Sequence, residues 1–331
     1  MDNFVFTCGD INGIGPEISI KAINQLYSKE KYKLTLIIPK NVFDYYREMI
    51  PLEFPFEISD SLANSNTNNG VVTILDIGEY ELNAGKSTAS AGLASYDAIL
   101  KAYELIKKQI GVAMITSPIS KTAWKLAGIE FTGHTDLLGD LAKNDNYLMM
   151  FLSSRFKTAL TTIHEPLEKV PTLITATRIK NVVKQVQTTF EFDLKIKSPR
   201  IAILGLNPHA GEGGHLGMEE LNEIIPAIKE LDEEGYNVEG PFVPDAYFGN
   251  KLHNKFDVTI GMYHDQVLIP FKLISFDEGV NYTAGLSIIR TSPDHGTAFD
   301  ISRKLVANPN SMIESFNWAR QIVKNRNCSL S

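Results

Sequence analysis

Three of the seven histidines each follow an apolar segment that is typical of a buried strand: His164, His209 and His264. The carboxyl ends of parallel strands meet at one edge of a sheet, so these imidazoles could gather around one cation. Three nitrogen ligands with an open fourth position are typical of catalytic Zn²⁺, and Asp245 or Asp265 could orient a ligand from behind. A purely structural role for each histidine is the alternative, and these residues alone leave both interpretations open.

The second of these histidines stands in a glycine-rich loop, Leu206-Asn207-Pro208-His209-Ala210-Gly211-Glu212-Gly213-Gly214. Glycine is favoured where the chain adopts positive φ or where backbone approaches a ligand closely. A phosphate cradle and a flexible loop with an incidental histidine are the alternatives. Because other segments offer better phosphate ligands, the sequence favours a loop that presents His209 to a metal.

Those phosphate ligands are cationic or lie at a predicted helix start. Lys272 and Arg290, with Asn281 as a neutral donor, suit a small phosphorylated or carboxylated substrate. His134 and Thr135 open a predicted helix, where free N–H groups attract anions, and Thr135 is the candidate N-cap. Ordinary surface cations and a simple helix cap are the alternative interpretations.

Two other glycine-containing segments fail the phosphate-binding patterns that they suggest. In residues 9–17 the third glycine of a dinucleotide fingerprint would fall on Ile18, so we interpret this segment as a tight turn near a site. Gly85-Lys86-Ser87 resembles the end of a P-loop, but the first glycine of that pattern would be Tyr80. His164-Glu165-Pro166 is not a zinc-protease motif, because its proline breaks a helix.

Predicted strands alternate with predicted helices along the chain, which favours a mostly parallel α/β fold. We predict strands at residues 4–8, 34–38, 71–75, 112–115, 147–152, 159–163, 200–204 and 256–262. We predict helices from 16, at 92–108, from 135, at 177–190, at 218–231, from 244 and from 311. No internal repeat and no long low-complexity linker interrupts this alternation.

The composition fits a chain with a large core and two domains, since 44% of its 331 residues are hydrophobic. A net charge of −7 and the absence of a Lys/Arg run argue against nucleic-acid binding. Two cysteines, Cys8 and Cys328, form no disulfide framework and fit a reducing compartment. The N-terminus predicts no signal peptide and no apolar run is long enough for a membrane span, so we expect a cytoplasmic protein.

Five motifs occur in one order between residue 5 and about residue 310. They are Gly9-Asp10-x-x-Gly13-Ile14-Gly15-Pro16-Glu17, Gly133-His134-Thr135-Asp136, the loop from Leu206 to Gly214, Tyr263-His264-Asp265-Gln266 and Asp294-His295-Gly296-Thr297-Ala298. Together they resemble the 4-hydroxythreonine-4-phosphate dehydrogenase family, which acts in pyridoxal 5′-phosphate biosynthesis. The resemblance implies an α/β fold of the isocitrate/isopropylmalate dehydrogenase type, with two α/β/α domains, mostly parallel sheets and an active site in the interdomain cleft.

The resemblance also gives roles to residues of this chain. Three fall on metal ligands, in a site shared between the two subunits of a homodimer: His164, His209 and His264. Five fall on substrate-binding positions: His134, Thr135, Lys272, Asn281 and Arg290. Five belong to a segment similar to the nucleotide-binding loop of the wider fold, which explains the missing fingerprint: His295, Gly296, Thr297, Asp300 and Asn308. The implied cofactors are NAD or NADP and one divalent metal, Zn²⁺, Mg²⁺ or Co²⁺.

From the same resemblance we expect a first domain made of both chain ends. It would comprise residues 1–126 and 267–331, with the nucleotide-binding loop near 292–309. The second domain, residues 127–266, would carry the metal ligands and the dimer interface.

The implied reaction is NAD(P)-dependent oxidation of 4-phosphohydroxy-L-threonine to 2-amino-3-oxo-4-phosphooxybutanoate, which loses CO₂ to give 3-amino-2-oxopropyl phosphate. A base removes the hydroxyl proton as hydride leaves, and three residues are unranked candidates for it: Asp245, Asp265 and Lys121.

The chain departs from the family pattern at three places, which usually hold Pro-Ala, Glu and Gly: Ile11-Asn12, Asp136 and Val267. The exact substrate therefore stays open between this compound and 4-phosphothreonate or 4-phosphoerythronate. A phosphate acyltransferase of similar fold and a zinc hydrolase are remoter alternatives.

Overall fold

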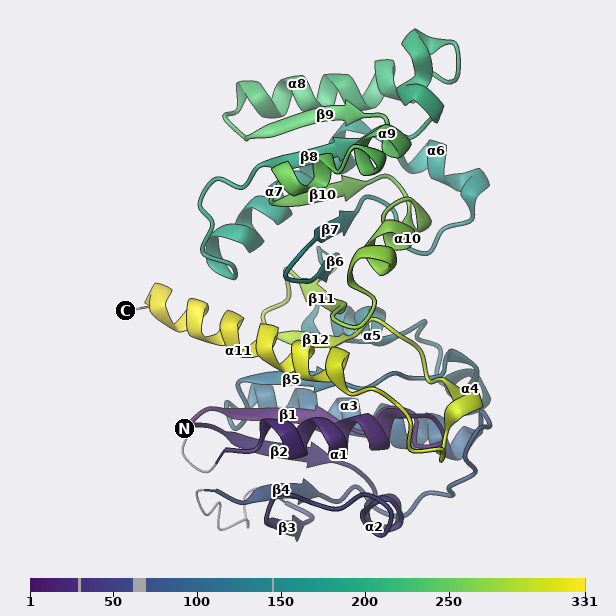
Figure 1. Ribbon diagram of the computed structural model, residues 1–331, viewed down its shortest axis with the longest axis vertical. Coiled ribbons are helices and arrows are strands. Elements are labelled where there is room, and N and C mark those ends of the chain that lie inside the picture. The colour runs from purple at the N-terminus through teal and green to yellow at the C-terminus, as the bar shows by residue number, and fades with distance from the viewer. Residues whose placement is uncertain (29–30, 62–69, 145, 331) are drawn as a thin grey trace. The chain divides into compact units, whose positions relative to one another are not determined.

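The computed structural model describes residues 1–28, 31–61, 70–144 and 146–330, which fold into two compact α/β units (Figure 1). Unit 1 consists of Met1–Asp145 and Leu286–Val323. Unit 2 consists of Asn146–Gly285 and Lys324–Ser331. Both chain ends were expected in the first domain, but the last residues of the chain belong to unit 2.

Unit 1 is built on parallel strands in the order β3-β4-β2-β1-β5-β12. These strands are β1 (Asn3–Thr7), β2 (Lys33–Ile37), β3 (Phe56–Ser59), β4 (Val72–Leu75), β5 (Ala113–Thr116) and β12 (Arg290–Pro293). Its helices are α1 (Gly15–Leu26), α2 (Lys40–Arg47), α3 (Ala89–Lys107), α4 (Lys121–Leu126), α5 (His134–Ala142), the 3₁₀ turn η5 (Phe299–Ile301) and the start of α11 (Asn310–Leu330). Helices α1 and α3 lie on opposite faces of this sheet (Figure 1).

Helix α3 shows how the sequence builds the packing of unit 1. Its Thr88 N-cap accepts a hydrogen bond from the Ala91 amide at 3.2 Å, which satisfies a donor at the helix start. Ala94, Ala98 and Ala102, which recur at helical spacing within the helix predicted at 92–108, are buried. On α4 the buried indole of Trp124 donates to Ser95 Oγ of α3 at 2.8 Å, so the two helices are held together by packing and by a polar contact.

Unit 2 has the strand order β11-β6-β7-β10-β8-β9, in which β6 is antiparallel to both neighbours and the other pairs are parallel. The strands are β6 (Leu148–Leu152), β7 (Lys157–Leu160), β8 (Ile201–Leu204), β9 (Val238–Phe242), β10 (Val258–Gly261) and β11 (Val280–Ala284). The helices and helical turns are η1 (Leu167–Lys169), α6 (Val170–Leu173), α7 (Ala176–Phe192), η2 (Pro208–Gly214), η3 (Glu220–Ile224), α8 (Ile225–Glu233), α9 (Pro244–Gly249), η4 (Leu252–Lys255) and α10 (His264–Ser275).

The core of unit 2 lies where α9 and α10 cover its sheet. Tyr247 of α9 and Phe271 of α10 are buried there against Phe151, Leu160 and Leu204 of the strands. The predicted α/β class with mostly parallel strands is therefore confirmed. Among the elements that we did not predict are β3, β9, β11, β12, α2 and α10. Polar residues interrupt each of these strands, so none of them is a continuous apolar run, and α10 contains a proline, Pro270, that argues against a helix.

The boundaries between the two units fall after residues 145 and 285, later in the chain than the expected domain boundaries after residues 126 and 266. Helix α5 stays with unit 1, where the Tyr103 hydroxyl donates to Leu141 O at 2.7 Å. Strand β11 stays with unit 2 because it pairs along its length with β6. Lys272 and Asn281 therefore belong to the unit that holds the three histidines. None of the helices that the structure describes has the length and apolar character needed to cross a membrane.

Candidate functional site

The three histidines leave the same edge of the sheet in unit 2. They follow the carboxyl ends of β7, β10 and β8, which are neighbouring parallel strands. His164 and His264 approach each other, with 5.5 Å between the centroids of their rings. The expectation that the histidines follow parallel strands, and so leave one edge of the sheet, is confirmed.

His264 is oriented by the acid that follows it. Its Nδ1 lies 2.7 Å from Asp265 Oδ1. When Nδ1 carries the hydrogen of this bond, Nε2 is the lone-pair nitrogen, and a carboxylate behind the ring is the usual arrangement for a metal-binding histidine. The donor set of this pair therefore fits a divalent cation.

His209 lies in a turn of unusual backbone conformation. Five consecutive residues, from His209 to Gly213, have positive φ between 42° and 77°. At Gly211 a Cβ would lie 2.7 Å from Glu220 Oε2, so this position requires glycine for both conformation and space. A left-handed conformation costs about 1–2 kcal/mol for a residue with a Cβ, which means that surrounding contacts must hold the turn.

A buried carboxylate supplies those contacts. Glu220 Oε1 accepts hydrogen bonds from the amides of Leu206 and Asn207, each at 2.7 Å. Its Oε2 accepts from Asn207 Nδ2 at 2.9 Å. Glu220 belongs to η3, a π-helical turn that replaces the first part of the helix predicted at 218–231. The loop is therefore fixed at its base and is not a flexible connection.

His209 itself is exposed at the tip of this fixed loop. Within one chain, the described residues contain no group of three or more His, Cys, Asp or Glu side chains that could hold a metal ion. The chain thus places His164 and His264 together and does not add His209 to them. Asp245 lies in the first turn of α9, an element that contacts the turn η2 on which His209 stands.

In unit 1, the predicted substrate residues gather at the start of α5. The N-cap of α5 is Gly133, so our prediction of Thr135 as the N-cap is wrong. Asp136 instead accepts from the Thr132 amide at 2.9 Å, which fixes the chain as it enters the helix. Because Gly133 has no side chain to cap the first turn, amide groups of that turn stay free of a side-chain cap and can meet an anion.

A buried cation lies near this helix start. Arg290 of β12 is 2% exposed, and its Nε donates to Thr116 Oγ1 of β5 at 2.9 Å. Burial lowers the pKa of Arg290 to about 9. Burial, and then the charge of Arg290, hold the pKa of His134 well below its usual value, so its ring is neutral at pH 7. Lys121, a candidate base, extends to within 3.9 Å of the Cβ position of Gly133.

Two predicted substrate residues carry buried polar atoms without a hydrogen-bond partner among the described residues. These atoms are Nε2 of His134 in unit 1 and Oδ1 of Asn281 in unit 2. Buried polar atoms are nearly always paired in folded proteins, so each points to a ligand or a water that completes it. The other predicted substrate residue of unit 2, Lys272, lies in the last turn of α10.

The predicted nucleotide segment of unit 1 is irregular apart from the 3₁₀ turn η5, and several of its residues are left-handed. Ala298, Arg303 and Leu305 all have positive φ. Gly296 is exposed, and no atom lies within 4 Å of the Cβ position that it lacks. The side chains of this segment offer imidazole, hydroxyl, carboxylate and amide groups, which suit the ribose and phosphate groups of a dinucleotide. The residues present therefore fit such a cofactor.

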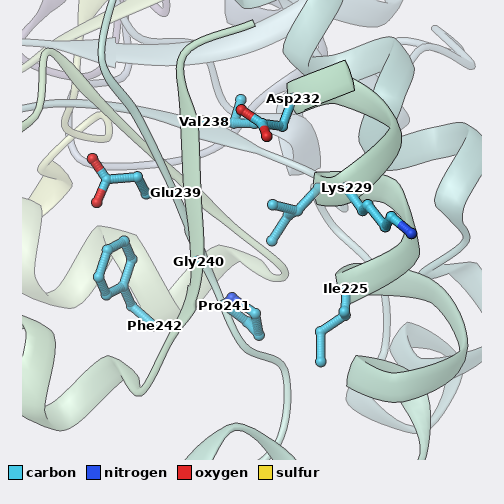
Figure 2. Close-up of a pocket in the computed structure, with 9 residues that line it drawn as sticks. Ile225, Lys229, Asp232, Val238, Glu239, Gly240, Pro241 and Phe242 are labelled. Atoms are coloured by element: carbon cyan, nitrogen blue, oxygen red, sulfur yellow. The ribbon is translucent and has the colours of Figure 1, made fainter. Parts of the chain in front are cut away.

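A groove in unit 2 does not involve the predicted residues. It has a volume of about 500 Å³ between α8 and β9, and Figure 2 shows Ile225 of α8 across from Pro241 of β9. None of the predicted site residues lines it. It offers no cluster of acid, base or metal-binding side chains comparable with the three histidines.

Sequence reasoning missed two residues that position the site. Glu220 had a detectable signal, because it lies one helical repeat before the buried Ile224, where an apolar residue is expected. A charge on the buried stripe of a helix indicates a specific partner. Thr116 had no comparable signal, since its contact with Arg290 joins residues 174 positions apart.

Comparisons with known proteins agree with this arrangement. The family model described as "Pyridoxal phosphate biosynthetic protein PdxA" matches residues 30–319. A 4-hydroxythreonine-4-phosphate dehydrogenase from Prosthecochloris aestuarii is 40% identical over 334 residues, covering 98% of each chain. The crystal structure of the enzyme of that name from Klebsiella pneumoniae has a TM-score of 0.83 at 33% identity and covers 97% of this chain and 98% of that one. An isocitrate dehydrogenase from Methylococcus capsulatus shares the fold alone, with a TM-score of 0.50 at 13% identity over all of this chain and 88% of that one.

Proposed function

Because the chain belongs to the family of the pyridoxal phosphate biosynthetic protein PdxA, we propose that it oxidises 4-phosphohydroxy-L-threonine with NAD or NADP and one divalent metal. Its relatives' shared name denotes an oxidoreductase that acts on a CH–OH group, and this chain is such an enzyme. The proposed product, 2-amino-3-oxo-4-phosphooxybutanoate, is a β-keto acid, so loss of CO₂ to give 3-amino-2-oxopropyl phosphate follows readily.

The observation that carries this proposal is the set of three histidines at the ends of adjacent parallel strands. His164 and His264 of one chain would hold the metal together with His209 of a second copy, which agrees with the absence of a third ligand near the pair within the described part of one chain. When bound, the cation would supply Lewis acidity and the dinucleotide a hydride acceptor. Zn²⁺, Mg²⁺ and Co²⁺ are the candidate ions.

The chain's own residues would bind the substrate through its charged ends. Arg290 and the uncapped start of α5 suit a phosphate or carboxylate, and Lys272 adds a point charge. The neutral ring of His134, with Thr135, can donate to an anionic oxygen without a full charge. Asn281 would complete its unpaired Oδ1 with a substrate N–H or O–H group.

Proton removal needs a base within hydrogen-bond reach of the substrate hydroxyl. Asp265 is engaged with His264, so we propose that it orients this imidazole. Asp245 or Lys121 would then take the proton, and the dinucleotide would lie on the segment of His295, Gly296, Thr297, Asp300 and Asn308.

A direct test replaces His209 with Ala and compares it with His215→Ala, a matched exposed histidine at the end of the same loop. We expect His209→Ala to lose bound metal and the absorbance of NADH formed from 4-phosphohydroxy-L-threonine, while His215→Ala keeps both. Retention of metal and turnover together in His209→Ala would refute the metal assignment. Absence of NADH formation by the unmodified protein would favour the phosphate acyltransferase or zinc hydrolase interpretation.

The same variants test whether two chains share the site. A 1:1 mixture of His209→Ala and His264→Ala chains would regain about a quarter of the activity, because half of the dimers would contain one intact site of two. If all three ligands acted within one chain, the mixture would stay inactive. The apolar face of α10 supports a contact with a second copy, since Ile269, Leu273 and Phe276 are 59%, 83% and 76% exposed.

Related phosphorylated hydroxy acids are the second candidate substrates. The departures at Ile11-Asn12, Asp136 and Val267 motivate this alternative. Comparison of kcat/KM for 4-phosphohydroxy-L-threonine, 4-phosphothreonate and 4-phosphoerythronate decides between them, and a larger value for either of the last two would replace the proposed substrate.

A further inference from the structure

We infer that Asn12 is a positioning residue for the dinucleotide: its buried side chain binds the segment 83–88 and so fixes the turn whose backbone holds the segment 297–302. This inference rests on the proposed function, because it takes 295–308 as the cofactor segment. Asn12 lies in the turn between β1 and α1, and none of its surface is exposed. It occupies one of the two positions at which the first motif departs from the family pattern.

The side chain of Asn12 binds the segment 83–88 through every polar group that it has. Its Oδ1 accepts from the Asn83 amide at 2.6 Å. Its Nδ2 donates to Lys86 O at 2.9 Å and to Thr88 Oγ1 at 3.1 Å. Since Thr88 also caps α3, the Asn12 side chain ties the segment to a rigid helix start. The segment 83–88, which contains Gly85-Lys86-Ser87, is therefore held in place by the Asn12 side chain and has a structural role.

The backbone of the same turn holds the proposed cofactor segment. Asn12 O accepts from the Ser302 hydroxyl and from the Gly85 amide, both at 2.7 Å. The amide of Ile14 donates to Thr297 O at 3.0 Å. A Cβ at Gly13 would lie 2.7 Å from Thr297 O, so glycine is needed for this close approach. The turn thus joins the segments 83–88 and 297–302 at one residue.

This geometry gives Asn12 an effect on cofactor binding without a contact to the cofactor. The segment 297–302 includes Ala298 in the left-handed region, with φ of 43°, which it would not keep without support. Without the Asn12 side chain, a smaller fraction of the protein molecules holds the segment 297–302 in the conformation that binds the dinucleotide. The apparent Kd rises in inverse proportion to that fraction.

The test compares Asn12→Ala and Thr88→Val with two matched controls. Thr88→Ser keeps the hydroxyl that accepts from Asn12. Asn24→Ala removes another amide of unit 1 that bridges backbone groups, at Pro51 O and the Glu53 amide, away from the cofactor segment. Measurements are amide hydrogen exchange without cofactor, calorimetric Kd values for NAD and NADP, and separate KM values for dinucleotide and phosphorylated substrate.

We expect exchange in 83–88 and 295–302 to accelerate in Asn12→Ala and Thr88→Val, with Kd and KM for the preferred dinucleotide raised on the order of tenfold. The KM for the phosphorylated substrate should stay within about twofold, and both controls should bind dinucleotide as the unmodified chain does. Unchanged dinucleotide affinity in Asn12→Ala, with normal binding by the unmodified chain, refutes the inference alone. Binding of neither dinucleotide by the unmodified chain refutes the proposed function and the inference with it.

Discussion

Removal of the Glu220 carboxylate should release the loop that carries His209. Glu220→Met keeps most of the side-chain volume but removes both oxygens, which accept three hydrogen bonds from Leu206 and Asn207. Hydrogen bonds to a charged group contribute about 1.5 kcal/mol or more each, so the three together contribute about 4.5 kcal/mol or more. Water that reaches the relaxed loop offsets part of this loss, and we expect the free energy of unfolding to fall by about 2–4 kcal/mol.

The same numbers predict a local effect on the left-handed turn. Its three residues with a Cβ, His209, Ala210 and Glu212, cost together about 3–6 kcal/mol, which is comparable with what Glu220 contributes. Without the carboxylate the turn should open more readily than the rest of unit 2. Amide exchange in residues 205–214 should therefore accelerate, and urea unfolding should report the global loss.

Glu219→Met is the matched control for this experiment. Within the described part of the chain, Glu219 accepts a single hydrogen bond, from Asn207 Nδ2 at 2.7 Å, and it is partly exposed. We expect it to lower the free energy of unfolding by about 1 kcal/mol or less. If Glu220→Met left both the exchange of 205–214 and the urea midpoint at their original values, the argument that this carboxylate holds the loop would be refuted.

Two further predictions concern buried charges. Burial raises the pKa of Asp10 to about 6 from 3.8, so the folded chain binds this proton more tightly than the unfolded chain, and the resulting stability is present below pH 4 and lost as pH rises to about 6. The difference in free energy of unfolding between Asp10→Asn and the original chain should therefore move in favour of Asp10→Asn by up to about 3 kcal/mol between pH 4 and pH 8. A difference in urea unfolding that does not change with pH would contradict this. Arg326→Met removes the guanidinium that donates to Asp193 Oδ1 at 2.6 Å and Oδ2 at 3.1 Å, and it should cost about 3 kcal/mol. The exposed Lys324→Met on the same helix should cost less than about 0.5 kcal/mol, and equal losses in the two variants would show that the ion pair contributes nothing.

The sequence predicts the helices and strands whose patterns lie within a few consecutive residues. Buried parallel strands are continuous apolar runs, so β1, β2, β4, β5 and β8 are predicted within a residue or two. In α3 the alanines at four-residue spacing indicate the buried face, because helical periodicity is also a local signal. Because β7, β10 and β8 prove to be adjacent, the histidines that follow them leave one edge of the sheet, as their positions after apolar runs predicted.

Contacts between distant residues decide the parts that the sequence does not predict. Arg290 meets Thr116, and Asn12 meets Thr88, only because strands and turns far apart in the chain become neighbours. Thr135 matched the N-cap preference, yet Gly133 caps α5, because the local preference of one residue is weaker than the path of the chain into the helix.

The glycine-rich loop shows both contributions in one place. Its glycines and its histidine, read from the sequence, predict a segment that presents His209 at a strand end. That the segment is a left-handed turn fixed by the buried Glu220 follows only from the tertiary structure. The glycines indicate that unusual backbone angles are accessible to the loop. Which of these angles the loop adopts depends on the buried carboxylate of Glu220, which lies on the helical turn that follows the loop.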